Sequence, residues 1–179
     1  MFLVAIVLAS ALAVPLLGGR LGALAEVRLR LPWALPAALA LQVVALDLPG
    51  VPGWLRPPLH VGSYLVAGAF LVANRRLPGM PLVGLGAAAN LLAIAANGGV
   101  MPASPSALAA AGLPPDPPGF TNSAALADPR LAFLGDVLAI PAGWPLANVF
   151  SVGDVLIAAG AAVAVHGLCG SRLPWRRRR

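Results

Sequence analysis

Charged residues are scarce in this chain of 179 residues, and lysine is absent altogether. Only 10% of the residues are charged, whereas a typical soluble domain carries about 25%. Hydrophobic residues make up 59% of the chain. This imbalance predicts that much of the surface faces a solvent other than water.

Cysteine and histidine are also rare, which limits the chemistry available. Cys169 is the only cysteine, so an intramolecular disulfide is excluded. The two histidines, His60 and His166, lie in different segments. Because these ligands do not cluster, we expect no zinc, no haem and no other cofactor.

What the chain does contain is a set of apolar segments, at residues 2–17, 32–48, 59–73, 80–96 and 152–169. Each has about 15 to 18 residues, close to the shortest helix that spans a bilayer. The sequence therefore predicts an all-α membrane protein with about five transmembrane helices. We expect a single membrane domain over residues 1–179, located in the cell (plasma) membrane.

All basic residues are arginines, and they lie in short clusters that flank the apolar segments. Ten of them obey one alternating scheme: Arg20, Arg28, Arg30, Arg75, Arg76, Arg172 and Arg176 to Arg179. Only Arg56 and Arg130 fall on the other side. The positive-inside rule then predicts an outside N-terminus and an inside C-terminus. A nucleic-acid binder would carry its basic residues along one solvated face, so no nucleic-acid partner is expected.

The long connection over residues 97–150 contains nine prolines, a density that excludes a long helix. It is nevertheless too apolar for a solvated tail, and a loop of this length is usually functional or disordered. We expect a partly ordered extracytoplasmic cap on the membrane surface, with Phe133, Leu134 and Trp144 buried or facing the membrane.

Two groups of polar residues have a simple structural explanation. Asn97-Gly98-Gly99 is typical of a helix C-terminus that stops in left-handed residues. Ser151 and Asp154 fit a capping box at the start of the last helix. Asn90 lies in the middle of an apolar segment, where its amide needs a partner.

A functional explanation remains open for Asp136 and Asp154. The connector between them contains Pro141, Gly143 and Pro145, so the chain can double back. Two carboxylates brought close together cannot both ionise easily, and one then keeps a proton while the other activates water. The sequence alone does not show that the two aspartates meet.

Four motifs resemble an uncharacterised family of bacterial multi-pass membrane proteins. They are Asn74-Arg75-Arg76-Leu77-Pro78-Gly79, Ala95-Ala96-Asn97-Gly98-Gly99-Val100-Met101-Pro102, Phe133-Leu134-Gly135-Asp136 and Asn148-Val149-Phe150-Ser151-Val152-Gly153-Asp154. The resemblance covers nearly the whole chain. It implies a membrane location and brings no activity with it.

The stretch from Asp136 to the last helix also resembles the end of signal peptidase II, the lipoprotein signal peptidase. In that family one catalytic aspartate precedes a loop, and the second lies in a Phe-Asn-x-Ala-Asp motif. Phe150-Ser151-Val152-Gly153-Asp154 takes that place here, with Ser151 and Gly153 departing from the motif. Asn97-x-Gly99 is similar to an Asn-x-Gly element of the family, and Asp128-x-Arg130 more weakly to an Asn-x-x-Asp-Arg element.

These observations leave two main functions open. The first is an aspartyl hydrolase acting on a membrane-embedded peptide or lipid-linked substrate, with catalytic Asp136 and Asp154. Its substrate-binding or supporting residues would be Asn90, Asn97, Asn122, Asp128, Arg130 and Ser151. The second is a non-enzymatic module that binds membrane lipids or a protein partner, with the aspartates as helix caps and loop anchors. A transporter is a third alternative, although Asn90 and Gln42 are the main polar residues of the apolar segments.

Overall fold

Five α-helices lie where the apolar segments predict them, with ends that differ from the expected ones by at most three residues. They were located in a computed structural model, which describes residues 2–117 and 119–172. The five helices are α1 (Phe2–Leu16), α2 (Ala34–Leu46), α3 (Arg56–Ala73), α4 (Met80–Ala96) and α6 (Val152–Leu168). Apolar composition and flanking Pro and Gly residues are sufficient to place these helices.

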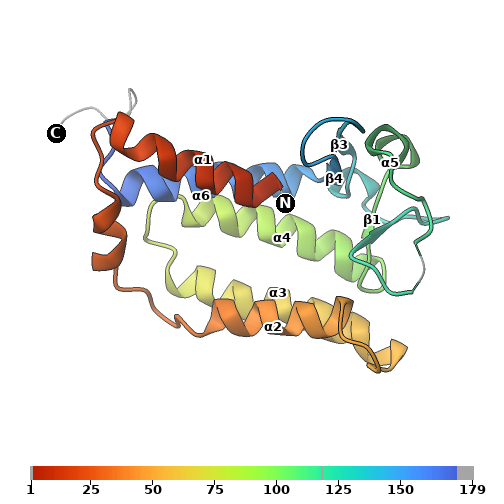
Figure 1. The fold of residues 1–179 in the computed structure, drawn as a ribbon. Coiled ribbons are helices and arrows are strands. Elements are labelled where there is room, and N and C mark those ends of the chain that lie inside the picture. The colour runs from red at the N-terminus through yellow and green to blue at the C-terminus, as the bar shows by residue number, and fades with distance from the viewer. Residues whose placement is uncertain (1, 118, 173–179) are drawn as a thin grey trace.

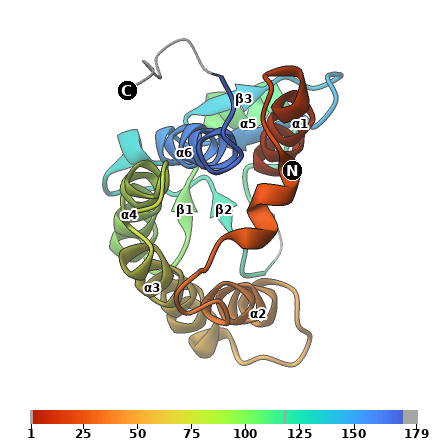
Figure 2. The same ribbon diagram turned by 90° about the vertical axis from the view of Figure 1, so that its left-hand side faces the viewer.

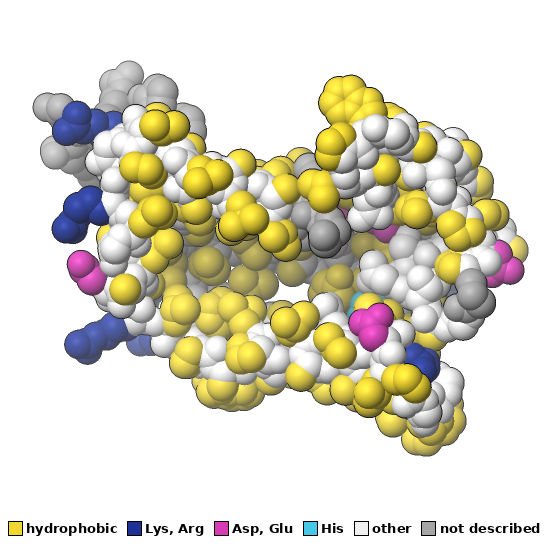
Figure 3. Space-filling view, in the orientation of Figure 1, with side chains coloured by type: hydrophobic (Ala, Val, Ile, Leu, Met, Phe, Trp, Pro, Cys, Tyr) yellow, Lys and Arg dark blue, Asp and Glu magenta, His cyan; other side chains and the backbone are white. Residues whose placement is uncertain are grey.

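The five helices run side by side along one direction and form an arc (Figures 1 and 2). The order around the arc is α1, α6, α4, α3 and α2, because each of these helices packs on the next. The segment after α1 contains the short 3-10 helix η1 (Leu21–Glu26) and leads across to α2. A hollow with hydrophobic side chains on its floor lies between α1 and α2 (Figure 3).

The connection between α4 and α6 folds into a cap at one end of the helices, beyond the end of α4 and the start of α6 (Figure 1). Its elements are β1 (Met101–Pro102), α5 (Pro105–Ala111), β2 (Ser123–Ala124), η3 (Ala132–Leu134), β3 (Leu138–Ile140) and β4 (Asn148–Phe150). β1 pairs with β2 in parallel, and β3 pairs with β4 antiparallel. These short strands make the fold mixed rather than all-α, which corrects the sequence prediction.

The core of the cap is small and separate from the contact between the cap and the helices. Ala103, Ala107, Leu108, Ala111 and Val149 form the buried cluster inside the cap. A second cluster, made of Ala93, Ile94 and Met101 with Leu134 packed against it, joins α4 to β1 and η3. The cap is therefore held to the helices by apolar packing at the end of α4.

Helices α4 and α6 approach each other so closely that glycine is required at several contacts. A Cβ atom on Gly86 would overlap the backbone oxygen of Gly153, and one on Gly79 would overlap that of Gly160. A Cβ on Gly160 would lie 2.7 Å from the backbone nitrogen of Val83. Glycine at these positions thus allows the two helix backbones to come into direct contact.

The structure overturns the prediction of five transmembrane helices. No helix within residues 2–117 and 119–172 combines the length and the apolar character needed to cross a membrane. α1, α2, α4 and α6 have between 13 and 17 residues, and a span needs about 20. α3 has 18 residues but contains Arg56, His60 and Ser63. The predicted multi-pass orientation and plasma-membrane localisation are corrected with it.

Many large apolar side chains nevertheless remain on the surface. Leu12 and Leu16 on α1 are 74% and 85% exposed, and Trp54 before α3 is 76% exposed. In the cap, Phe133 and Trp144 are also exposed rather than buried, whereas Leu134 is half-buried.

Candidate functional site

A cluster of polar side chains lies where α4, the start of α6 and the cap meet. Asn90 Nδ2 donates a hydrogen bond of 2.9 Å to Asp154 Oδ1, and Ser151 Oγ donates one of 2.8 Å to Asn90 Oδ1. Asn90 and Ser151 are buried, and Asp154 is half-buried. The side-chain amide of Asn90, which was expected to need a partner, therefore bonds with residues at the start of α6.

The capping box at the start of α6 is confirmed. The backbone N–H of Asp154 donates to Ser151 Oγ at 2.9 Å, and the backbone N–H of Ser151 donates to Asp154 Oδ2 at 3.0 Å. Gly153 is necessary beside this box, because a Cβ there would overlap Asn90 Oδ1. Both oxygens of Asp154 are thus engaged by groups that organise the helix start.

Asp136 lies in the cap and is only 4% exposed. Its backbone N–H donates to Pro102 O at 2.9 Å, and its backbone oxygen accepts from the N–H of Ser104 at 3.0 Å. Its Oδ2 accepts a hydrogen bond of 2.6 Å from Ser123 Oγ. Asp136 therefore connects β1, the start of α5 and β2.

Burial raises the pKa of Asp136 to about 6, and the negative charge of Asp154 contributes in the same direction. The hydrogen bond from Ser123 opposes this shift. The two carboxyl groups are thus close enough to interact electrostatically. Within the described part of the chain, however, no hydrogen bond joins them, since each binds its own partners.

Tyr64 belongs to the same environment and was not singled out as a site residue from the sequence. Burial raises the pKa of its hydroxyl, and the charges of Asp154 and Asp136 raise it further, while the interaction with Asn90 lowers it. The phenol therefore keeps its proton at neutral pH, and its hydroxyl interacts with Asn90. The only signal in the sequence is a single tyrosine in an apolar helix.

His60 on α3 is another residue that sequence reasoning did not place in the site. Its side chain is fully buried, and Nδ1 lies 2.7 Å from Gly99 O, so Nδ1 carries the proton in that bond. Nε2 has no hydrogen-bond partner among the described residues. The ring stands edge-on to Tyr64 and Phe120, and burial lowers its pKa. His60 is thus a neutral packing residue beneath the cap.

Asn97 anchors the cap rather than facing Asp136 or Asp154. It is the C-cap of α4, followed by Gly98 and Gly99 in left-handed conformations, as predicted. Its Nδ2 donates to Ala93 O and Arg130 O at 2.7 Å each, and its Oδ1 accepts from the N–H of Arg130 at 2.9 Å. Arg130 therefore contributes its backbone, and its side chain is exposed.

The two remaining candidates lie outside the polar cluster. Asp128 is exposed in the cap. Asn122 is exposed as well, and its backbone oxygen accepts from the N–H of Met101 at 2.8 Å, next to the pairing of β1 with β2. Ser123, which was not predicted, takes the position beside Asp136 instead.

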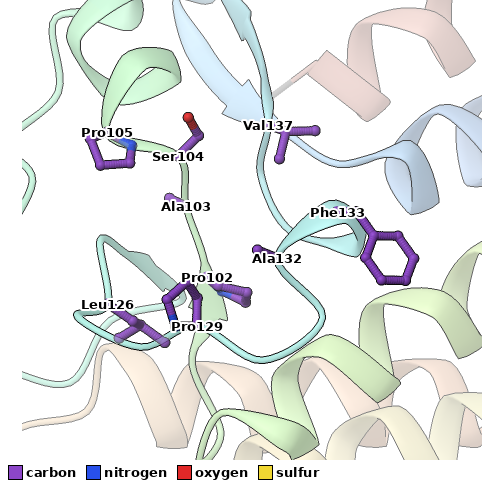
Figure 4. A pocket seen from close by; sticks show the side chains of 9 residues that line it. All are labelled: Pro102, Ala103, Ser104, Pro105, Leu126, Pro129, Ala132, Phe133 and Val137. Carbon is purple, nitrogen blue, oxygen red and sulfur yellow. The ribbon is translucent and has the colours of Figure 1, made fainter.

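An apolar pocket of about 320 Å³ opens in the cap (Figure 4). Three segments of the cap line it, with Pro102, Ala103, Ser104, Pro105, Leu126, Pro129, Ala132, Phe133 and Val137. Ser104 supplies its only side-chain hydroxyl, which is 2.7 Å from Ser106 Oγ. Pockets of about 300–1,000 Å³ with apolar linings are typical of small-molecule sites.

The described residues contain no group of three or more His, Cys, Asp or Glu side chains that is arranged to hold a metal ion. The polar cluster where α4, α6 and the cap meet comprises a buried carboxyl, a phenol, amides and hydroxyl groups.

Comparison with known proteins gives a family and no activity. The model of a family described as of unknown function (DUF5317) matches residues 26–166. No curated protein and no solved structure matches the chain. The resemblance of the C-terminal part to signal peptidase II receives no support from these comparisons.

Proposed function

The chain belongs to the DUF5317 family, whose function is unknown, and we propose that it is a binding module for the apolar part of a small amphiphile. The ligand would be held in the pocket of the cap. This proposal takes up the non-enzymatic alternative that the sequence left open. It does not depend on a membrane-spanning fold.

The observation that carries the proposal is that the polar cluster has structural roles, whereas the pocket is lined mainly by apolar side chains. Asp154 and Ser151 form the capping box at the start of α6. Asn97 ties the segment between α4 and α6 to the end of α4. None of these three residues lines the pocket, whose wall consists mainly of proline and aliphatic side chains with Phe133. Such a lining favours a hydrocarbon chain over a polar substrate.

Ser104 indicates where the polar end of such a ligand would lie. Ser104 is the N-cap residue of α5, and its backbone N–H already donates a hydrogen bond of 3.0 Å to Asp136 O. The hydroxyl pairs with Ser106 Oγ in an exposed position. A ligand head group with hydrogen-bonding atoms can exchange with that pairing at little cost.

The test is calorimetric titration of dodecanoate into the intact protein and two variants. Ala132→Leu adds three carbons inside the pocket and should weaken binding about tenfold or more, because the apolar volume is then occupied. Ala109→Leu makes the same change on an exposed face of α5 that does not line this pocket, and it should leave affinity unchanged. Equal effects of the two substitutions would show that the pocket is not the site.

A second candidate, the aspartyl hydrolase, is favoured by one specific observation. The pKa of Asp136 is raised to about 6, with the charge of Asp154 among the causes, and acid–base residues are commonly tuned in this way. The bonds of Asp154 to the helix start weigh against it as a free base. Hydrolysis of a quenched fluorescent lipopeptide that is abolished by both Asp136→Asn and Asp154→Asn would favour the enzyme, and a rate unaffected by either change would exclude it.

A further inference from the structure

Three arginines line one small pocket at the end of the molecule opposite the cap. Arg28 and Arg30 come from the segment after η1, and Arg76 comes from the turn between α3 and α4. The pocket has a volume of about 180 Å³, and Ala73, Asn74 and Leu77 complete its lining. None of these described lining residues is acidic, so the three positive charges have no counter-charge in the wall.

The framework of this pocket is built by Asn74, which is buried. Its Nδ2 donates to Arg30 O and to Phe70 O at 2.8 Å each, and its Oδ1 accepts from the N–H of Arg30 at 2.9 Å. The amide thus fastens the backbone of Arg30 to the end of α3 across 44 positions of sequence. Because that backbone is fixed, the arginines are held on the same pocket rather than spread along a loop.

The surrounding end of the molecule reinforces the positive charge. Basic side chains gather there in Figure 3, whereas the acidic residues of the cap lie at the far end. The turn that carries Arg76 packs against α6, since a Cβ on Gly167 would lie 2.6 Å from Pro78 Cβ. The backbone of Arg172 is bonded to Leu17 O at 2.9 Å, so this arginine belongs to the same end. Glu26 precedes the pocket segment but does not line the pocket.

The sequence analysis attributed these arginines to the orientation of transmembrane helices. That explanation no longer applies, because the prediction of transmembrane helices is wrong. We propose instead that the pocket binds a phosphate monoester group, carried either by a small phosphorylated molecule or by a lipid head group. Guanidinium groups bind phosphate oxygens through paired hydrogen bonds, which lysine does not reproduce. The small volume admits the phosphate and a few further atoms, since drug-sized ligands occupy about 300 Å³ or more.

Two titrations on the full-length protein test this site and distinguish the two sources of phosphate. In the first, inorganic phosphate is titrated and followed by calorimetry. In the second, the protein is mixed with phosphatidylcholine vesicles that contain or lack phosphatidic acid, and co-sedimentation is measured. Phosphate binding in solution identifies a small-molecule site, and binding only to vesicles with phosphatidic acid identifies a head-group site.

Matched variants decide whether the pocket is responsible. Arg76→Gln should weaken binding about tenfold or more in whichever of the two titrations detects it, because it removes a charge-assisted contact. Arg75→Gln removes the same charge from the neighbouring residue, which does not line the pocket and donates to Val72 O in the last turn of α3. It should change the affinity by less than about threefold, as expected of an exposed, screened charge outside the pocket.

Three outcomes would overturn the proposal. They are the absence of binding in both arms, equal losses for Arg75→Gln and Arg76→Gln, and vesicle binding that is independent of phosphatidic acid when inorganic phosphate does not bind. Both arginine side chains are exposed, so these substitutions leave the fold intact. Circular dichroism and the thermal unfolding midpoint of each variant verify this directly. This site is independent of the pocket in the cap.

Discussion

Asn90 on α4 donates a hydrogen bond of 2.9 Å to Asp154 in the first turn of α6, across 64 positions of sequence. The same amide accepts from Ser151 Oγ at 2.8 Å. The capping box of α6 therefore includes a third residue from another helix. This arrangement ties the start of α6 to one position along α4 and stabilises the closest helix contact in the fold.

Replacing Asn90 should accordingly cost far more than an ordinary amide substitution. Asn90→Leu leaves the Ser151 hydroxyl without its acceptor and removes a donor from Asp154, so unfolding free energy should fall by about 2–3 kcal/mol. Gln42→Leu on α2 is the matched control, since Gln42 is half-buried and outside this cluster. Denaturant unfolding measures both variants, and equal losses would contradict a special role for Asn90.

The raised pKa of Asp136 predicts a specific dependence of stability on pH. Because the folded-state pKa is about 6 and the ordinary value is 3.8, the folded state holds this proton more tightly. Stability should therefore decrease as pH rises between these two values, by up to about 3 kcal/mol in total. Asp136→Asn removes this slope, and unfolding measured across the same pH range checks it.

The comparison with Asp136→Asn is needed because His60 changes the pH dependence of stability in the opposite direction. Burial lowers the pKa of His60 from 6.5, so its contribution to stability rises as pH approaches that value. The difference between the wild type and Asp136→Asn cancels the histidine contribution. A difference that stays constant with pH would refute the assignment of the raised pKa to Asp136.

Two glycines on α4 should respond in opposite ways to the same substitution. Gly86→Ala places a methyl group against the backbone of Gly153 and should destabilise the fold by about 2 kcal/mol or more. A Cβ on Gly84 meets nothing within 4 Å, so Gly84→Ala should stabilise by about 0.5–1 kcal/mol through helix propensity. Thermal unfolding midpoints that move in the same direction would argue against the close backbone contact.

The anchoring role of Asn97 predicts a local effect in the cap. Asn97→Ala removes both side-chain bonds to the backbone of Arg130 and should accelerate amide hydrogen exchange at Arg130. The global cost should be about 1 kcal/mol, because these bonds lie in an exposed region. Asn122→Ala is the control, since the bond of Asn122 at β1 is made by its backbone. Unchanged exchange in Asn97→Ala would disprove the anchor.

Local patterns in the sequence predicted the helices and their ends well. The capping box of Ser151 and Asp154 depends on residues three apart, and the left-handed stop after Asn97 depends on two adjacent glycines. Such features are determined by neighbouring residues and are readable without a fold. The strands of the cap have two or three residues each, which is too short for an alternating pattern to emerge.

The membrane prediction failed because apolar segments at the lower length limit were accepted as spans, whereas a span needs about 20 residues. Segment 59–73 was expected to be a spanning helix, yet α3 begins at Arg56 and includes His60 and Ser63 among its buried residues. The contacts of Asn90 with Asp154 and of Asn74 with Arg30 were not predictable either. They join positions that only tertiary packing brings together, and no spacing in the sequence encodes them.

The direct contact of the α4 and α6 backbones also gives the molecule a modular character. α4 ends at Ala96 and α6 begins at Val152, and both partners of the Asn90–Asp154 bond lie outside the chain between these ends. The cap is therefore an insertion between two helices that are also joined directly to each other. Evolution or an engineer can lengthen, shorten or exchange it with little additional entropy of closure, while the helical frame stays unchanged.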